Sequence, residues 1–201
     1  MRLVLGISGA TGSIYGIRTL QVLSALGVET HLVMTSHAER NILIETSYTP
    51  DQVRSIASYV HDVRDVGAPP ASGSFLADGM IVAPCSIKTL SAIANSYNDN
   101  LLVRAADVTL KERRKLVLVV RETPLHLGHL ELMSRVVQAG AVLLPPVPAF
   151  YHHPRTIEDL VDQTVGKILD QFGLQHCLFK RWDGACGLTE AVPVFQPAGR
   201  R

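Results

Sequence analysis

The fold is decided by residues 1–27, MRLVLGISGATGSIYGIRTLQVLSALG, where three kinds of segment follow one another. Residues 3–7 are aliphatic and predict a buried strand. Residues 8–13 are rich in Gly, Ser and Thr and predict a loop, and residues 14–26 have the apolar spacing of a helix. Gly27 ends that helix, because glycine favours the position just past a helix C-terminus. The stretch therefore predicts a strand, a glycine-rich loop at its carboxyl end, and a helix.

The same alternation of strand and helix continues to residue 172. Further apolar strands are predicted at residues 28–34, 80–83, 116–120 and 141–144. Helices are predicted after the capping residue Ser36, after Thr49-Pro50-Asp51-Gln52, and at residues 87–95, 101–111, 123–139 and 156–172. Apolar strands separated by helices indicate a parallel sheet covered on both faces. We therefore expect an α/β fold with one doubly wound, mostly parallel sheet in three layers, flavodoxin-like or Rossmann-like.

The chain shows one long predicted loop and one change of composition. Residues 61–78 form the loop, and loops of this length in compact domains are commonly functional or disordered. No linker or internal repeat interrupts the chain before its polar end. We therefore expect one domain over residues 1–183 and a flexible polar tail over residues 184–201.

Composition limits the classes of function. The 201 residues carry 19 Lys and Arg against 18 Asp and Glu, so no basic surplus favours nucleic acid. The 47% share of hydrophobic residues is high for a lone domain and predicts buried subunit interfaces. Cys85, Cys177 and Cys186 form neither a disulfide framework nor a zinc pattern, which favours a reducing, cytoplasmic compartment. We expect no signal peptide and no membrane span, because the apolar runs are too short for either.

Polar residues follow four predicted strands, where ligands bind in such sheets. The loop around Gly9 and Gly12 could hold a phosphate on its backbone N–H groups, or could simply be a tight turn. The second strand ends in Thr35-Ser36 and lacks the acid that binds a ribose in dinucleotide enzymes. This weighs against NAD and leaves a mononucleotide possible, although an ordinary helix cap would look the same.

The later strands end in charged and hydroxyl residues. Ser86, Lys88 and Thr89 offer donors at a helix start, whereas Cys85 has no adjacent base and is more typical of a buried thiol. Arg121-Glu122 ends a central strand, where a charged pair is costly unless it binds something. With Arg104, Lys111, Tyr151 and Lys167 it could form a basic pocket for a second phosphate, although each cation alone would suit a helix surface.

The histidines suggest two other interpretations. His126-Leu127-Gly128-His129 matches the His-x-Gly-His of nucleotidyltransferases, but that motif normally follows the first strand. A metal site at His126 and His129, or at His152-His153, lacks a third ligand. Neither interpretation is favoured.

Eight motifs, in the same order along the chain, are typical of one protein family. They are Gly9-Ala10-Thr11-Gly12, Ala71-Ser72-Gly73-Ser74, Pro84-Cys85-Ser86-Ile87-Lys88-Thr89-Leu90, Arg104-Ala105-Ala106-Asp107-Val108, Leu110-Lys111-Glu112-Arg113, Arg121-Glu122-Thr123-Pro124-Leu125, Pro146-Val147-Pro148-Ala149-Phe150-Tyr151-His152 and Arg181-Trp182. From residue 2 to about residue 183 the chain resembles the UbiX-type flavin prenyltransferases. That family includes the small proteins encoded beside the decarboxylase in bacterial phenolic-acid decarboxylase operons.

The resemblance implies an activity and partners. Such enzymes transfer a dimethylallyl group from dimethylallyl monophosphate to N5 and C6 of reduced FMN, without a metal. They form homododecamers with FMN at subunit interfaces. The prenylated FMN then serves a UbiD-type decarboxylase of aromatic or phenolic acids, in detoxification or in ubiquinone biosynthesis.

The resemblance also implies roles for individual residues. FMN would be held by Gly9, Ala10, Thr11, Ser36, Ser86, Ile87, Lys88, Thr89 and Arg121. The donor phosphate would be held by Arg104, Lys111, Arg121, Tyr151 and Lys167. The catalytic residues would be Glu122, Thr11, Tyr151 and Trp182, with Glu122 handling a proton and the aromatic rings facing an allylic cation.

Two departures and two alternatives accompany this interpretation. Thr11 stands where many members have Ser, and Lys167 stands where some have Arg, which replaces a bidentate phosphate contact by a point charge. An FMN-dependent cysteine decarboxylase is one alternative, but its Pro-x-Met-Asn segment is replaced here by Pro84-Cys85-Ser86-Ile87. A non-catalytic FMN-binding subunit of a decarboxylase complex is the other. The intact Arg121-Glu122 pair and Tyr151 favour the enzyme.

Overall fold

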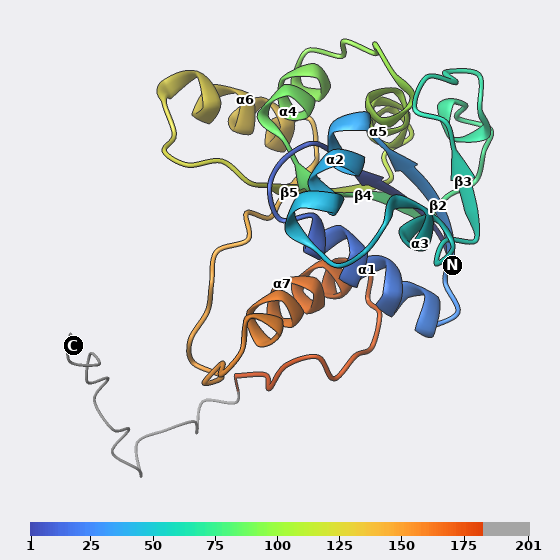
Figure 1. Cartoon of the computed structure of the whole chain (residues 1–201). Coiled ribbons are helices and arrows are strands. Elements are labelled where there is room, and N and C mark those ends of the chain that lie inside the picture. The colour runs from blue at the N-terminus through green and yellow to red at the C-terminus, as the bar shows by residue number, and fades with distance from the viewer. Residues whose placement is uncertain (183–201) are drawn as a thin grey trace.

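A computed structural model describes residues 1–182, so the predicted tail at residues 184–201 lies outside the described residues. Six strands form one sheet in the order β3-β2-β1-β4-β5-β6, with every neighbouring pair parallel (Figure 1). Their bounds are β1 Arg2–Ile7, β2 Glu29–Met34, β3 Tyr59–His61, β4 Gly79–Cys85, β5 Lys115–Val120 and β6 Val142–Leu143. This is the strand order of the Rossmann fold, which confirms the predicted doubly wound α/β architecture.

The alternation of side chains along each strand divides the core into two layers. In β1, Leu3, Leu5 and Ile7 pack on one face of the sheet, whereas Val4 packs on the other. In β5, Val117 and Val119 join the first layer, and Leu116, Leu118 and Val120 join the second. Because both faces are apolar, helices must cover both faces of the sheet.

Helices fill the two layers as the sequence predicts. The first layer contains residues of α1 (Ser13–Ala25), α2 (Ser36–Glu45), α3 (Pro50–Arg54) and α7 (Ile157–Gln171). The second contains residues of α4 (Ile87–Ala94), α5 (Leu101–Lys111) and α6 (Leu127–Gln138). Figure 1 shows α1 and α7 side by side on one face of the sheet and α4, α5 and α6 on the other. Among the described residues, no helix has both the length and the apolar character needed to cross a membrane.

Three details differ from the sequence-based expectations. The helix predicted from Thr123 begins at Leu127, and Thr123-Pro124 lies before it in the loop. Thr35, rather than Ser36, caps α2, because its hydroxyl accepts a hydrogen bond from the Ala38 N–H at 3.2 Å. The short strand β3 was not predicted; its three residues are too few to give a periodic signal. It extends the sheet at the β2 edge.

The strand order creates a switch point between β1 and β4. From β1 the chain proceeds to β2 and β3 on one side, and from β4 to β5 and β6 on the other. The loops that leave the carboxyl ends of β1 and β4 therefore diverge and leave a crevice between them. Residues from both loops line the cavity described next.

Candidate functional site

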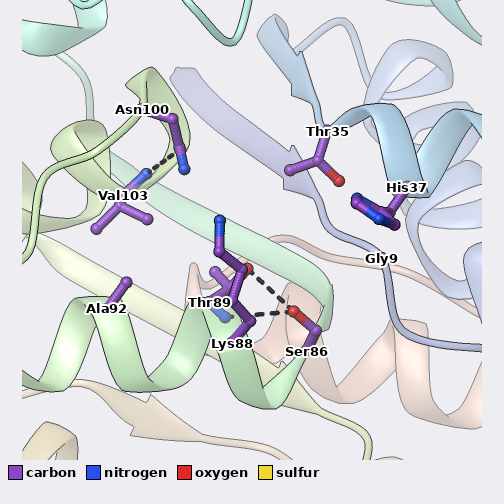
Figure 2. Close-up of a pocket in the computed structure, with 9 residues that line it drawn as sticks. All are labelled: Gly9, Thr35, His37, Ser86, Lys88, Thr89, Ala92, Asn100 and Val103. Carbon is purple, nitrogen blue, oxygen red and sulfur yellow. Dashed lines mark hydrogen bonds between the residues drawn. The ribbon is translucent and has the colours of Figure 1, made fainter.

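A cavity of about 220 Å³ opens at the carboxyl ends of β1, β2 and β4. We call it the sheet-end pocket. Figure 2 shows the residues that line it, namely Gly9, Thr35, His37, Ser86, Lys88, Thr89, Ala92, Asn100 and Val103. The sequence-predicted residues Gly9, Ser86, Lys88 and Thr89 are thus brought together, although they come from segments almost eighty residues apart. Thr35, His37 and Asn100 line the same cavity and were not predicted as site residues.

Three helices begin at the sheet-end pocket, and each is capped by a residue that lines it. Thr35 caps α2, Ser86 caps α4 through the Thr89 N–H at 3.3 Å, and Asn100 caps α5 through the Val103 N–H at 3.1 Å. Helix N-termini carry partial positive charge and unpaired N–H groups, which favour anions. Three of them converge here, so the pocket suits a phosphate group.

Two basic side chains face the sheet-end pocket from opposite walls. Lys88 lies on the α4 side and His37 on the α2 side (Figure 2). The Lys88 ammonium also contacts the Asp99 carboxylate at 3.2 Å, and its side chain is 77% exposed. Most of its donor capacity therefore remains available for a bound anion.

Gly9, in the loop after β1, lies so close to the first turn of α2 that a side chain would not fit there. A Cβ atom at this position would collide with the Cβ of His37, which is fixed close to the α2 backbone. The absence of a side chain lets the first turn of α2 approach the glycine-rich loop, and this close approach forms the wall of the pocket.

The rest of the glycine-rich loop makes contacts that the sequence did not predict. The N–H groups of Gly12 and Ser13 both donate to the Glu45 carboxylate, at 2.8 and 3.0 Å. The start of α1 therefore already has an anion, supplied by the end of α2. Ala10 and Thr11 do not line the sheet-end pocket, and the Ala10 carbonyl accepts a hydrogen bond from Asn41 at 3.1 Å.

Ser8 joins the two loops at the switch point. Its fully buried hydroxyl donates to the Pro84 carbonyl at 2.9 Å and accepts from the Ser86 N–H at 2.8 Å. The loop after β1 thereby fixes the residue that caps α4. A serine beside a glycine gives no strong signal in one sequence, so only the fold reveals this positioning role.

Arg121 and Glu122 follow β5, as predicted, but do not line the sheet-end pocket. The backbone N–H of Arg121 donates to the Cys85 carbonyl at 3.2 Å, and the Glu122 carboxylate accepts from the backbone N–H of Thr123 at 3.1 Å. Burial raises the pKa of Tyr15, and the nearby positive charge of Arg121 partly opposes that rise. The Arg121 charge therefore acts on a residue in the first turn of α1.

A second group of predicted residues meets near the C-terminal end of the described chain. The rings of Tyr151 and Trp182 contact edge to face, with centroids 5.9 Å apart. Lys167 on α7 lies 3.6 Å from the Asp170 carboxylate, which also binds Arg181. We call these five residues the C-terminal corner. Asp170 and Arg181 were not predicted as site residues, although Arg181 is part of a motif that the sequence analysis identified.

Arg104 and Lys111 lie on α5, apart from both groups. Arg104 donates to the Ala71 carbonyl at 3.2 Å and pairs with Asp107 at 3.0 Å. Lys111 pairs with Glu112 beside Gly73. The two cations therefore border the loop that contains the Ala71-Ser72-Gly73-Ser74 motif.

The other candidates have structural explanations. Cys85 is fully buried, and burial raises the pKa of its thiol, which disfavours a nucleophilic thiolate. The rings of His126 and His129 contact each other at a tilt of 34°, with centroids 3.6 Å apart. Over residues 1–182, no group of three or more His, Cys, Asp or Glu side chains is arranged to hold a metal ion.

Comparisons with known proteins agree with this architecture. The family model named Flavoprotein matches residues 1–170. The flavin prenyltransferase UbiX of Thauera aromatica is 62% identical over 184 residues, which cover 92% of this chain and 95% of that protein. The matched range of the family model includes the strands and loops that form the sheet-end pocket.

Two solved structures have the same fold at high identity. The AnUbiX protein in complex with FMN and dimethylallyl pyrophosphate is 56% identical, with a TM-score of 0.90 over 91% of this chain and 97% of that chain. A dodecameric FMN-dependent UbiX-like decarboxylase from Escherichia coli O157:H7 is 50% identical, with a TM-score of 0.90 over 92% of this chain and all of that chain. The chain thus belongs to the flavoprotein family and, within it, to the UbiX-type flavin prenyltransferases.

Proposed function

We propose that residues 1–183 form a flavin prenyltransferase that joins the dimethylallyl group of dimethylallyl monophosphate to reduced FMN. The observation that carries the proposal is the convergence of three capped helix N-termini on one cavity in a UbiX-type chain. The pocket accepts a phosphate, and the C-terminal corner supplies aromatic rings and cations for a second, prenyl-bearing phosphate. When bound, reduced FMN supplies the N5 and C6 atoms that accept the dimethylallyl group.

The FMN phosphate would bind in the sheet-end pocket. Ser86, Lys88 and Thr89 line it and offer hydroxyl, ammonium and backbone N–H groups. Ser36 and Ile87 do not line it, and Ser36 lines a separate cavity beside Glu39, but their backbone N–H groups belong to the first turns of α2 and α4. The residues fit this group because no carboxylate is among the described residues that line the pocket, and Glu45 binds the glycine-rich loop at the start of α1 instead. Gly9, Ala10, Thr11 and Arg121 would border the remainder of the flavin.

The donor phosphate would be held by Tyr151 and Lys167 of one protomer. Arg104 and Lys111 lie on another part of the surface, which supports a site completed by a neighbouring protomer. The dodecameric relative supports the same arrangement, and we propose a homododecamer. Cleaving the allylic C–O bond leaves negative charge on the phosphate oxygens, and the cations would stabilise that charge.

Two kinds of side chain would act on the reacting atoms in different ways. Trp182 and Tyr151 would face the allylic cation with their π-electron clouds and offer it no nucleophile. Glu122 would hold or move a proton at a phosphate oxygen or at the flavin, and the Thr11 hydroxyl would assist at the glycine-rich loop. The product would pass to a UbiD-type decarboxylase of aromatic or phenolic acids in the cytoplasm.

The test is product formation by the purified protein with FMN, a reductant and dimethylallyl monophosphate. We expect mass spectrometry of the released flavin to show FMN heavier by one prenyl unit. Bound but unmodified FMN would contradict the enzyme and favour a non-catalytic FMN-binding subunit.

A matched pair of variants then tests the role of Glu122. Glu122→Gln should retain FMN and slow prenyl transfer by about 100-fold or more, because general acid–base groups contribute at least that much. Glu131→Gln, on the exposed surface of α6, should behave like the unaltered protein. Loss of FMN together with activity in Glu122→Gln would indicate a structural role instead.

A further inference from the structure

The Asp170 carboxylate gathers several basic groups at the C-terminal corner. Arg181 binds it with two parallel hydrogen bonds, at 2.7 and 3.1 Å. Lys167 lies 3.6 Å from the same carboxylate, and a His176 ring nitrogen lies 3.2 Å from it. Two permanent cations thus share one carboxylate, so the cluster carries a net positive charge. Such a cluster attracts an anion.

The carboxylate of this cluster is sheltered, whereas its cations reach solvent. The side chain of Asp170 is 19% exposed, but those of Lys167 and Arg181 are about half exposed. The hydrogen bonds from Arg181 lower the pKa of Asp170, so the carboxylate remains charged and keeps the guanidinium oriented. A guanidinium has five N–H donors, and the contacts with Asp170 and His176 use three of them.

Arg181 also lies beside the residues proposed to hold the donor. It directly precedes Trp182, whose ring contacts Tyr151. Hydrogen bonding to Asp170 raises the pKa of Arg181, so its guanidinium stays charged. The guanidinium carbon lies 5.5 Å from the centre of the Phe179 ring, which further limits its orientation. In Figure 1 the segment after α7 turns back towards the loop that precedes α7, and this path brings Trp182 to Tyr151.

We propose that Arg181 is a second cationic ligand for the donor phosphate, beside Lys167, and that Asp170 is its positioning residue. This inference rests on the function proposed above. Lys167 offers only a point charge, whereas a guanidinium held by a carboxylate offers its other N–H donors in fixed directions. Both terminal nitrogens of Arg181 already bind Asp170, so Arg181 would add a single directed, charge-assisted hydrogen bond to the phosphate from an N–H that faces away from that carboxylate.

Binding can be measured without turnover by loading the protein with oxidised FMN and titrating dimethylallyl monophosphate. Trp182 is the chain's single tryptophan, so its fluorescence reports on this corner alone, and calorimetry gives a second readout. We expect Arg181→Gln to weaken donor binding by about 10-fold or more, because a charge-assisted hydrogen bond contributes that much. Arg181→Lys should recover part of the loss. FMN affinity should change by less than about twofold, since a single exposed charge remote from the pocket contributes little to it.

Two comparisons distinguish a phosphate ligand from a residue that only anchors the chain end. Inorganic phosphate lacks the prenyl group, so a direct ligand predicts that Arg181→Gln weakens phosphate and donor by similar factors. Weaker donor binding with unchanged phosphate binding would overturn the proposal. It would show that Arg181 only positions the neighbouring Trp182 ring. Arg135→Gln, on the exposed face of α6, is the matched control and should leave both affinities unchanged.

The two proposals fail in different ways. If the unaltered protein forms prenylated FMN and Arg181→Gln binds donor and phosphate as tightly, only the role of Arg181 is wrong. If the unaltered protein neither binds the donor nor forms the product, the proposed function itself is wrong.

Discussion

The sheet-end pocket and the C-terminal corner are both suited to a phosphate, but they are constructed differently. The pocket consists of backbone and short caps at the starts of α2, α4 and α5, each fixed by a hydrogen bond within its own helix. In the corner the cationic groups are the long side chains of Lys167 and Arg181. Both contact Asp170, and both are about half exposed. One site depends on the path of the backbone and the other on charge.

This difference predicts how each site responds to change. Backbone N–H groups at helix starts cannot move independently of their helices, so small steric changes should affect the pocket strongly. Exposed ion pairs contribute modestly and are screened by salt. Binding at the corner should therefore fall with ionic strength, while binding in the pocket depends more on packing.

The largest effect should come from Gly9→Ala in the pocket. The added methyl group collides with the Cβ of His37, so the start of α2 must shift and its N–H groups move away from the cavity. We expect FMN affinity to fall by about 10- to 100-fold and the free energy of unfolding to fall by about 1–3 kcal/mol, a typical cost of overpacking. Flavin fluorescence titration and thermal unfolding measure the two effects.

Gly67→Ala is the matched control for this change. Gly67 lies in an exposed loop, where the nearest atom to an added Cβ is an Asp65 carboxylate oxygen at 3.3 Å. It should leave FMN affinity unaltered. Full FMN affinity in Gly9→Ala would show that the approach of α2 to the loop does not shape the pocket.

A smaller effect is expected from Ser8→Ala, which removes the link between the two pocket loops. The partly buried Ser86 N–H loses its acceptor, which costs about 1–3 kcal/mol of folding free energy. If the loss of this hydrogen bond weakens FMN binding by about 1.4 kcal/mol, FMN affinity should fall by about tenfold. Ser134→Ala, at an exposed position of α6, should change neither quantity. Reduced stability with unchanged FMN affinity would limit Ser8 to a folding role.

The smallest effect should come from Lys167→Gln in the corner. Its half-exposed ammonium is expected to contribute about 3- to 10-fold to donor affinity, a loss that should shrink as salt is added. Lys167→Arg should instead bind the donor slightly more tightly, because it restores a planar pair of donors. Donor titrations at two ionic strengths test both variants. Equal effects of Lys167→Gln at low and high salt would contradict the charge-based description of the corner.

Much of the fold followed from local patterns in the sequence. The helix bounds of α1, α4, α5 and α7 lie within about two residues of those expected, because apolar spacing and capping residues are local signals. The capping box at Thr49 and Gln52 is present in α3, as predicted. The predicted start of α6 was wrong, because Thr123-Pro124 has the residue types of a helix start but lies in the preceding loop. The short strand β3 gives too weak a pattern to detect.

The site was only partly predictable for the same reason. Gly9, Ser86, Lys88 and Thr89 follow predicted strands, and carboxyl ends of parallel strands meet at one edge, so their convergence could be expected. Asn100 caps a helix that does not follow a strand directly, and nothing local relates it to Gly9. Ser8 and Glu45 act through hydrogen bonds to residues 32 to 78 positions away.

By itself the sequence determined the alternation of strand and helix, the glycine-rich loop and the family, because these depend on the order of residue types along the chain. Only the tertiary structure decided which groups share a site. It assigned the first N–H groups of α1 to Glu45 and brought the starts of α2, α4 and α5 around one cavity. It also joined Arg181 to Asp170. Such contacts join segments distant in sequence, and their geometry is fixed only when the sheet and its helices pack together.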